Sequence, residues 1–130
     1  MSGILPTLMA AVPPNAFSIH HLDRWVRFAV LMLRQAGIQT YESCQGGAGH
    51  AFPEPTVRFE GTKSDAFRAV AAVRAHGLPA HHLRQFWRLN EHGAERPAWE
   101  MTFYPLTRLV AIQRQAERHG LMRRAVPSSK

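Results

Sequence analysis

The sequence predicts a single α+β domain in which helices pack on one face of a four-stranded, mainly antiparallel sheet. Apolar residues recur at helical spacing in three segments, and four further segments have the composition or the alternation of strands. These segments follow one another in the order α-β-β-α-β-β-α, which this layered architecture accommodates. The chain has 130 residues, of which 45% are hydrophobic and 19% charged, as in ordinary one-domain globular proteins.

The first expected helix follows an irregular arm, residues 1–17, that contains three prolines. Asn15 or Ser18 can cap this helix, because either side chain can accept a hydrogen bond from a free amide of the first turn. Apolar residues then recur every three or four positions over Leu22–Ala36. Gly37 suits the left-handed conformation that ends a helix.

Two strands, Ile38–Glu42 and Thr56–Glu60, are expected on either side of a glycine-rich segment. A second helix should begin after a cap at Thr62 or Ser64 and run to Gly77. Its expected apolar positions are Phe67, Val70, Ala71 and Val73.

A polar turn, Asn90–Pro97, is expected to join a third strand, His81–Leu89, to a fourth, Ala98–Tyr104. The third helix should follow Pro105 and end at Gly120. The aromatic residues expected in the core are Trp25, Phe59, Trp87, Trp99 and Phe103.

The sheet face turned away from the helices is expected to carry as many acidic as basic residues. They are Glu42, Arg58, Glu60, Arg84, Arg88 and Glu100. This balance predicts a solvated face of cross-strand ion pairs rather than an anion-binding face. Phe86 and Tyr104 lie on the same face beside the arginines, where they could stack on a planar ligand.

Charge and cysteine content narrow the class of protein. No apolar run approaches the roughly 20 residues of a membrane helix, and the single cysteine excludes an internal disulfide, so we expect a cytoplasmic protein without membrane contact. The net charge is +7, and residues 105–130 hold six Lys/Arg against one Glu. This basic segment could contact nucleic acid or another protein. Its last part, residues 121–130, is expected to be a disordered tail.

The candidate site lies in Tyr41–Glu60, which contains the only cysteine, three closely spaced glycines and a histidine. Glycines let the backbone approach a ligand and point amides at it, so we expect a small anionic or nucleotide-like ligand here. The expected ligand-binding residues are Ser43, Gly46, Gly47, Gly49, Arg58 and Arg84.

Two other classes of function stay open. Cys44 could be a catalytic thiol activated by His50, with Glu42 or Glu54 orienting the imidazole. Cys44 and His50 could also hold a metal together with the histidine doublets at positions 20–21 and 81–82. The chain has no paired, closely spaced metal-binding motif, so the sequence assigns no metal ligand and identifies no cofactor.

A third class is an interaction protein of a phage or another mobile element, which would use apolar residues 4–12 and basic residues 105–130. The string E-S-C-Q-G-G-A-G-H-A-F-P-E-P-T-V-R-F-E-G at residues 42–61 resembles a family of small bacterial and phage-encoded proteins with the pattern E-S-C-x-G-G-x-G-H followed by P-T-V-R-F. This resemblance implies no particular activity.

A shorter likeness is to the methyltransferases of wybutosine synthesis, through Ser43, Cys44 and Gly46. Gln45 departs from that pattern, and the arginine that follows its glycine is absent, so methyl transfer is not implied.

Overall fold

The computed structural model describes residues 21–122, except for the side chains of Asn90, Ala94 and Glu95. Its elements are η4 (Arg24–Val26), α1 (Arg27–Gln35), β1 (Gln39–Cys44), β2 (Thr56–Glu60), α2 (Lys63–Arg74), β3 (Ala80–Asn90), β4 (Gly93–Phe103) and α3 (Leu106–Arg118). The expected α+β architecture and the order α-β-β-α-β-β-α are confirmed.

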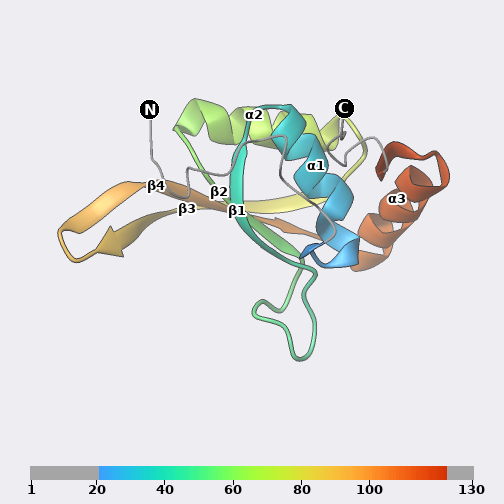
Figure 1. The fold of residues 1–130 in the computed structure, drawn as a ribbon, viewed down its shortest axis with the longest axis horizontal. Helices are drawn as coiled ribbons and strands as arrows, with labels where there is room; N and C mark the ends of the chain where they lie inside the picture. Colours follow the sequence, from blue (N-terminus) through green and yellow to red (C-terminus); the bar gives the residue numbers. More distant parts are fainter. Residues whose placement is uncertain (1–20, 123–130) are drawn as a thin grey trace.

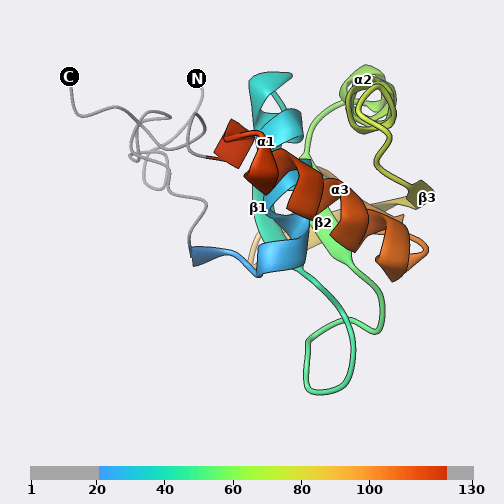
Figure 2. The same ribbon diagram turned by 90° about the vertical axis from the view of Figure 1, so that its right-hand side faces the viewer.

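The four strands form one sheet in the order β1-β2-β4-β3, and every neighbouring pair is antiparallel. The helices gather on one face of this sheet, and the long loop between β1 and β2 projects from the body of the domain (Figures 1 and 2). This loop contains the predicted site, and its two ends are fixed by the pairing of β1 with β2.

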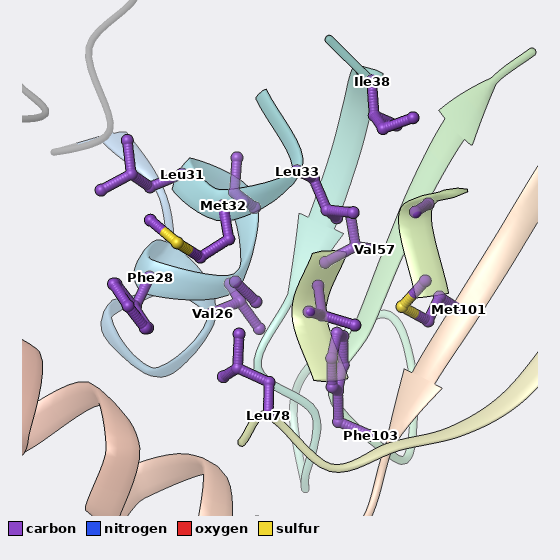
Figure 3. Close-up of a cluster of buried hydrophobic side chains, with 14 of the residues drawn as sticks. Val26, Phe28, Leu31, Met32, Leu33, Ile38, Val57, Leu78, Met101 and Phe103 are labelled. Atoms are coloured by element: carbon purple, nitrogen blue, oxygen red, sulfur yellow. The ribbon is translucent and has the colours of Figure 1, made fainter. Parts of the chain in front are cut away.

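The hydrophobic core lies between the helices and the sheet (Figure 3). All six residues of the α1 segment 28–33 are buried, which is more than the single stripe of a surface helix. This burial follows from the position of α1, which contacts α2, α3 and β1. The expected core aromatics Phe59, Trp99 and Phe103 are buried as well.

Helix α2 begins with a cap at Thr62, one of the two caps that we expected from the sequence. The Thr62 hydroxyl accepts a hydrogen bond from the backbone N–H of Asp65, and the Asp65 carboxylate accepts one from Thr62. The predicted apolar face of this helix is partly wrong, because Phe67 is 59% exposed. Ala66, Ala69 and Val73 are the residues that face the core. Small side chains such as alanine let the helix pack closely on the sheet. Because alanine is only weakly hydrophobic, these positions do not stand out in the hydrophobic pattern of the sequence.

The β3–β4 hairpin is longer than predicted. The segment expected to be a polar turn, 90–97, belongs largely to β4, and Asn90 pairs directly with Gly93. The hairpin therefore extends beyond the helical layer (Figure 1). As a result Trp87, expected in the core, is 53% exposed and Leu89 is 76% exposed. Their alternation is that of a core face, but no helix of the described chain covers this end of the sheet.

The opposite sheet face carries the expected cross-strand ion pairs. Glu100 lies at its centre, with carboxylate oxygens 3.1 Å from Arg58 and 2.6 Å from Arg84. Arg58 also pairs with Glu42 at 3.3 Å, and Arg88 pairs with Glu60. Burial raises the pKa of Glu100, but the hydrogen bonds from Arg84 and Arg58 outweigh it and leave this pKa below its usual value.

Some expectations concern residues outside 21–122. They include the irregular arm, the caps Asn15 and Ser18, and residues 123–130. Leu121 and Met122, which we assigned to the tail, instead pack against the core. Within the described residues, no helix combines the length and the apolar character needed to cross a membrane.

Candidate functional site

Cys44, His50 and Asp23 converge where β1 leads into the glycine-rich loop. The Cys44 sulfur, one imidazole nitrogen of His50 and one carboxylate oxygen of Asp23 all lie within 4.8 Å of one another. The structure thus brings together the two residues that we proposed from sequence and adds a third. We refer to Asp23, Cys44 and His50 as the DCH cluster.

The three members come from different parts of the fold. Asp23 immediately precedes η4, Cys44 is the last residue of β1, and His50 lies in the loop. Cys44 is buried, with 5% of its surface exposed, whereas His50 is exposed. The cluster therefore has a buried sulfur at its base and an imidazole on the solvent side.

Asp23 is held in place by the start of the loop. Its Oδ2 accepts a hydrogen bond of 3.0 Å from the backbone N–H of Gln45 and lies 3.5 Å from Nδ1 of His50. The Gln45 side chain completes the connection, because its Oε1 accepts a bond of 3.4 Å from the backbone N–H of Trp25. Two hydrogen bonds in opposite directions thus join the loop to the segment before α1.

Gly46 allows the two ends of the loop, residues 46–47 and residues 53–54, to come into close contact. We call this contact the neck of the loop. Its φ is +81°, and a Cβ atom at this position would lie 2.5 Å from the backbone carbonyl carbon of Glu54. No side chain fits that space, which explains why glycine is needed here. The next residue closes the neck of the loop, because the N–H of Gly47 donates to the carbonyl of Pro53 at 3.1 Å.

Of the three loop amides that we expected to bind an anion, those of Gly46 and Gly47 have partners within the protein. The N–H of Gly46 donates to the Cys44 sulfur at 3.4 Å, and that of Gly47 donates to Pro53. The N–H of His50 donates to the carbonyl of Gly47 at 3.1 Å. An anion could use the first two amides only if the neck of the loop opened.

The other predicted ligand-binding residues lie outside the cluster. Ser43 precedes Cys44 in β1, so their side chains point to opposite faces of the strand. The buried Ser43 hydroxyl has no hydrogen-bond partner in the described structure. Arg58 forms ion pairs with Glu100 and Glu42, and Arg84 forms one with Glu100. The guanidinium carbon of Arg58 also lies 4.8 Å from the centre of the Phe52 ring.

The acid beside His50 is Asp23 rather than Glu42 or Glu54. Glu42 points to the open face of the sheet, where it pairs with Arg58. The sequence did not indicate that Asp23 would lie beside His50. Asp23 is 21 positions before Cys44, and the helical periodicity placed it in the first expected helix. The contact depends on how η4 and the end of β1 meet in space.

The described members of the histidine doublets, His21, His81 and His82, do not join the DCH cluster, which is the one potential metal-ligand group of three or more side chains in residues 21–122. His21 is exposed, and His81 stacks at 5.4 Å against Tyr104. His20 lies outside the described residues.

The described part of the basic segment is spread along α3. Arg108 donates to the carbonyl of Gly77, and the Arg114 guanidinium lies 5.3 Å from the Trp25 ring. Contact of this segment with nucleic acid or protein stays a prediction.

No protein-family model matches the chain, and neither the curated proteins nor the solved structures give a significant match to it. The likeness of residues 42–61 to small bacterial and phage-encoded proteins therefore stays a prediction. The chemistry of the site has to be inferred from its own geometry.

Proposed function

We propose that this protein binds one transition-metal ion, with Zn²⁺ the best match, through Asp23, Cys44 and His50. The observation that carries this proposal is the convergence of a thiol sulfur, an imidazole nitrogen and a carboxylate oxygen within 4.8 Å. These are the three kinds of donor atom that Zn²⁺ accepts in proteins. Hard cations such as Mg²⁺ and Ca²⁺ prefer oxygen ligands and fit this set poorly.

The donor atoms need little movement to coordinate one ion. Tetrahedral zinc ligands are separated by roughly 3.5 Å, given the usual metal–ligand distances. The Asp23 and His50 atoms are already 3.5 Å apart. The Gln45 N–H orients the Asp23 carboxylate, and the Gly46 N–H reaches the sulfur of Cys44. Such secondary hydrogen bonds orient the ligands of metal sites.

Three protein ligands leave the fourth position of a tetrahedral zinc site open, as in catalytic rather than structural sites. The small anionic ligand expected from the sequence would then bind the metal at this position. It would not need the amides of Gly46 and Gly47, which have partners in the loop. His50 is exposed, so a ligand can reach the solvent side of the cluster.

Titration of the protein with Co²⁺ tests the proposal. Co²⁺ replaces Zn²⁺ in such sites and gives a thiolate-to-metal charge-transfer band when sulfur coordinates it. Cys44 is the only cysteine in the chain, so any such band belongs to this residue. We expect one equivalent of Co²⁺ to produce the band and Zn²⁺ to remove it.

Single substitutions in the cluster identify its ligands. Cys44→Ser should abolish the band, and Asp23→Asn or His50→Gln should lower affinity by more than the roughly 10–100-fold typical of outer-shell partners. His81→Gln, a histidine outside the cluster, is the matched control and should leave affinity unchanged. The proposal is wrong if the wild-type protein gives no band, or if His81→Gln weakens binding as much as His50→Gln.

A second candidate function is a cysteine enzyme in which His50 activates Cys44 and Asp23 orients His50. The distance of 3.5 Å between His50 Nδ1 and Asp23 Oδ2 favours this alternative. It predicts that Cys44 is alkylated rapidly well below pH 8.5 in metal-free protein, and that His50→Gln removes this reactivity. A metal site without enzymatic activity predicts instead that bound Zn²⁺ protects Cys44 from the alkylating reagent.

A further inference from the structure

A largely apolar groove runs between α2 and β3, on the side of the sheet that carries the helices. Its volume is about 470 Å³, and its lining includes Phe67, Val70, Ala71, Leu83 and Met101. Phe67 is 59% exposed at this groove, although it is one of the largest apolar side chains of α2. The groove thus exposes apolar surface that the core does not use.

The groove lies beside an open edge of the sheet. In the order β1-β2-β4-β3, strand β3 pairs with β4 on one side, and no described strand pairs with its other side. An 11-residue edge strand presents a row of backbone N–H and C=O groups to a further strand. Trp87 and Leu89 continue the exposed apolar surface along the same strand.

The charges around the groove favour an acidic partner. Within α2 and β3 there are five Lys/Arg residues and one acidic residue, and two of the five, Arg84 and Arg88, are paired with Glu100 and Glu60 of the neighbouring strands, which leaves a net charge of +2. The acidic residue, Asp65, is occupied by the helix cap and by Arg68. Arg74, His81 and His82 lie directly at the groove.

We propose that β3 binds an extended segment of a partner protein as a fifth strand of the sheet, and that this segment alternates apolar with acidic residues. Alternate side chains of an added strand point to opposite faces of the sheet. One set would fill the groove between Phe67 and Leu83, and the other would lie on the open face, where it would compete with Glu100 and Glu60 for Arg84 and Arg88. Backbone pairing gives affinity in this mode of recognition, and the groove and the charges give specificity.

A fluorescein-labelled, N-acetylated nonapeptide of alternating Glu and Val/Leu is a direct probe for binding to the full chain. Fluorescence anisotropy should give saturable binding that weakens with salt. The same peptide with Lys in place of Glu should bind at least tenfold more weakly, because Arg74 lies at the groove and the net charge of α2 and β3 is positive. A central proline should have a similar effect, because proline cannot donate to a strand ladder.

Two substitutions test the location on the protein. Phe67→Asp and Arg74→Glu alter exposed side chains and should each weaken binding at least fivefold without unfolding the domain. Leu106→Asp makes the same kind of change at a side chain that is 43% exposed and does not line the groove, and it should have no effect. Binding that survives both groove substitutions would overturn the proposal.

Amide hydrogen exchange tests the pairing itself. On peptide binding, alternate amides of β3 should become protected, because every second N–H of an edge strand points outward. Protection at β1, the other edge of the sheet, would contradict the proposal. A concentration-dependent dimer that the peptide does not dissociate would instead assign β3 to a second copy of the chain. Absence of any peptide binding would also overturn the proposal.

Discussion

The Gln113 side chain of α3 accepts a hydrogen bond of 2.7 Å from the backbone N–H of Phe28, at the start of α1. Its amide nitrogen donates to Glu117 at 3.0 Å, and Glu117 in turn receives two hydrogen bonds from Arg24, at 3.0 and 2.6 Å. Gln113 is almost completely buried, with 1% of its surface exposed. This network fixes the segment before α1, which is also the segment that presents Asp23 to the DCH cluster.

Replacing Gln113 should show how much the network contributes. Gln113→Leu leaves the amide of Phe28 buried without its partner, which costs about 1–3 kcal/mol of unfolding free energy. Gln115→Leu, at an exposed position of the same helix, is the control and should change stability little. Urea unfolding of both variants measures the difference. Equal losses would show that the hydrogen bond to Phe28 contributes nothing.

The same network predicts a loss of stability in acid. Hydrogen bonding to Arg24 lowers the pKa of Glu117 from 4.5 to about 2, against the opposing effect of partial burial. The unfolded chain therefore binds a proton at higher pH than the native protein does. The stabilisation is complete above about pH 4.5 and disappears as the pH falls towards 2.

Glu117→Gln should remove this part of the pH dependence. We expect the variant to lose roughly 1 kcal/mol at neutral pH, a modest value because Arg24 is half exposed. The difference from wild type should shrink between pH 4.5 and 2. Glu91→Gln, whose side chain is 86% exposed at the hairpin, is the matched control and should follow wild type throughout. A constant difference down to pH 2 would contradict the assignment of this titration to Glu117.

Local chemistry was sufficient to predict most of the fold. The spacing of apolar residues identified all three helices, and Thr62 was one of the two caps expected for α2; in the structure its partner Asp65 is only three residues away. The alternation in β4 correctly placed Trp99 and Phe103 in the core. Errors arose where tertiary position decides burial. Trp87 alternates as a core residue, but the sheet extends past the helices at that point.

The site was predicted only in part, for the same reason. Cys44 and His50 lie six residues apart, so their meeting required only a bent loop. Asp23 meets them through the packing of η4 against the end of β1, and no sequence pattern records that contact. The three glycines looked equivalent in sequence. The structure separates them, because a side chain at Gly46 would meet the backbone and one at Gly47 or Gly49 would meet nothing within 4 Å.

Removing the Asp23 carboxylate should loosen the loop even without metal. Asp23→Ala removes the carboxylate that accepts the hydrogen bond from the N–H of Gln45 and that lies beside the His50 imidazole. We expect a loss of about 1 kcal/mol in stability and faster amide exchange at Gln45. Glu54→Ala removes a carboxylate of the same loop that is not part of the cluster, and it should leave exchange at Gln45 unchanged. Equal acceleration in both variants would show that Asp23 has no special role.

Gly46→Ala and Gly47→Ala form a matched pair for the neck of the loop. Both glycines have positive φ, +81° and +98°, so alanine costs each about 1–2 kcal/mol of backbone strain. Only at Gly46 does the new Cβ also meet backbone, 2.5 Å from the Glu54 carbonyl carbon and 2.7 Å from the Pro55 nitrogen. This overlap should bring the total cost of Gly46→Ala to about 2–4 kcal/mol.

The readouts are urea unfolding and the rate of Cys44 alkylation. Forcing residues 46 and 54 apart opens the neck beside the buried sulfur, so Gly46→Ala should accelerate alkylation of Cys44. Gly47→Ala should leave the rate close to that of wild type, because a Cβ at this position meets no atom within 4 Å. If the two variants lose equal stability and react equally fast, the close approach of Gly46 to Glu54 does not control access to the thiol.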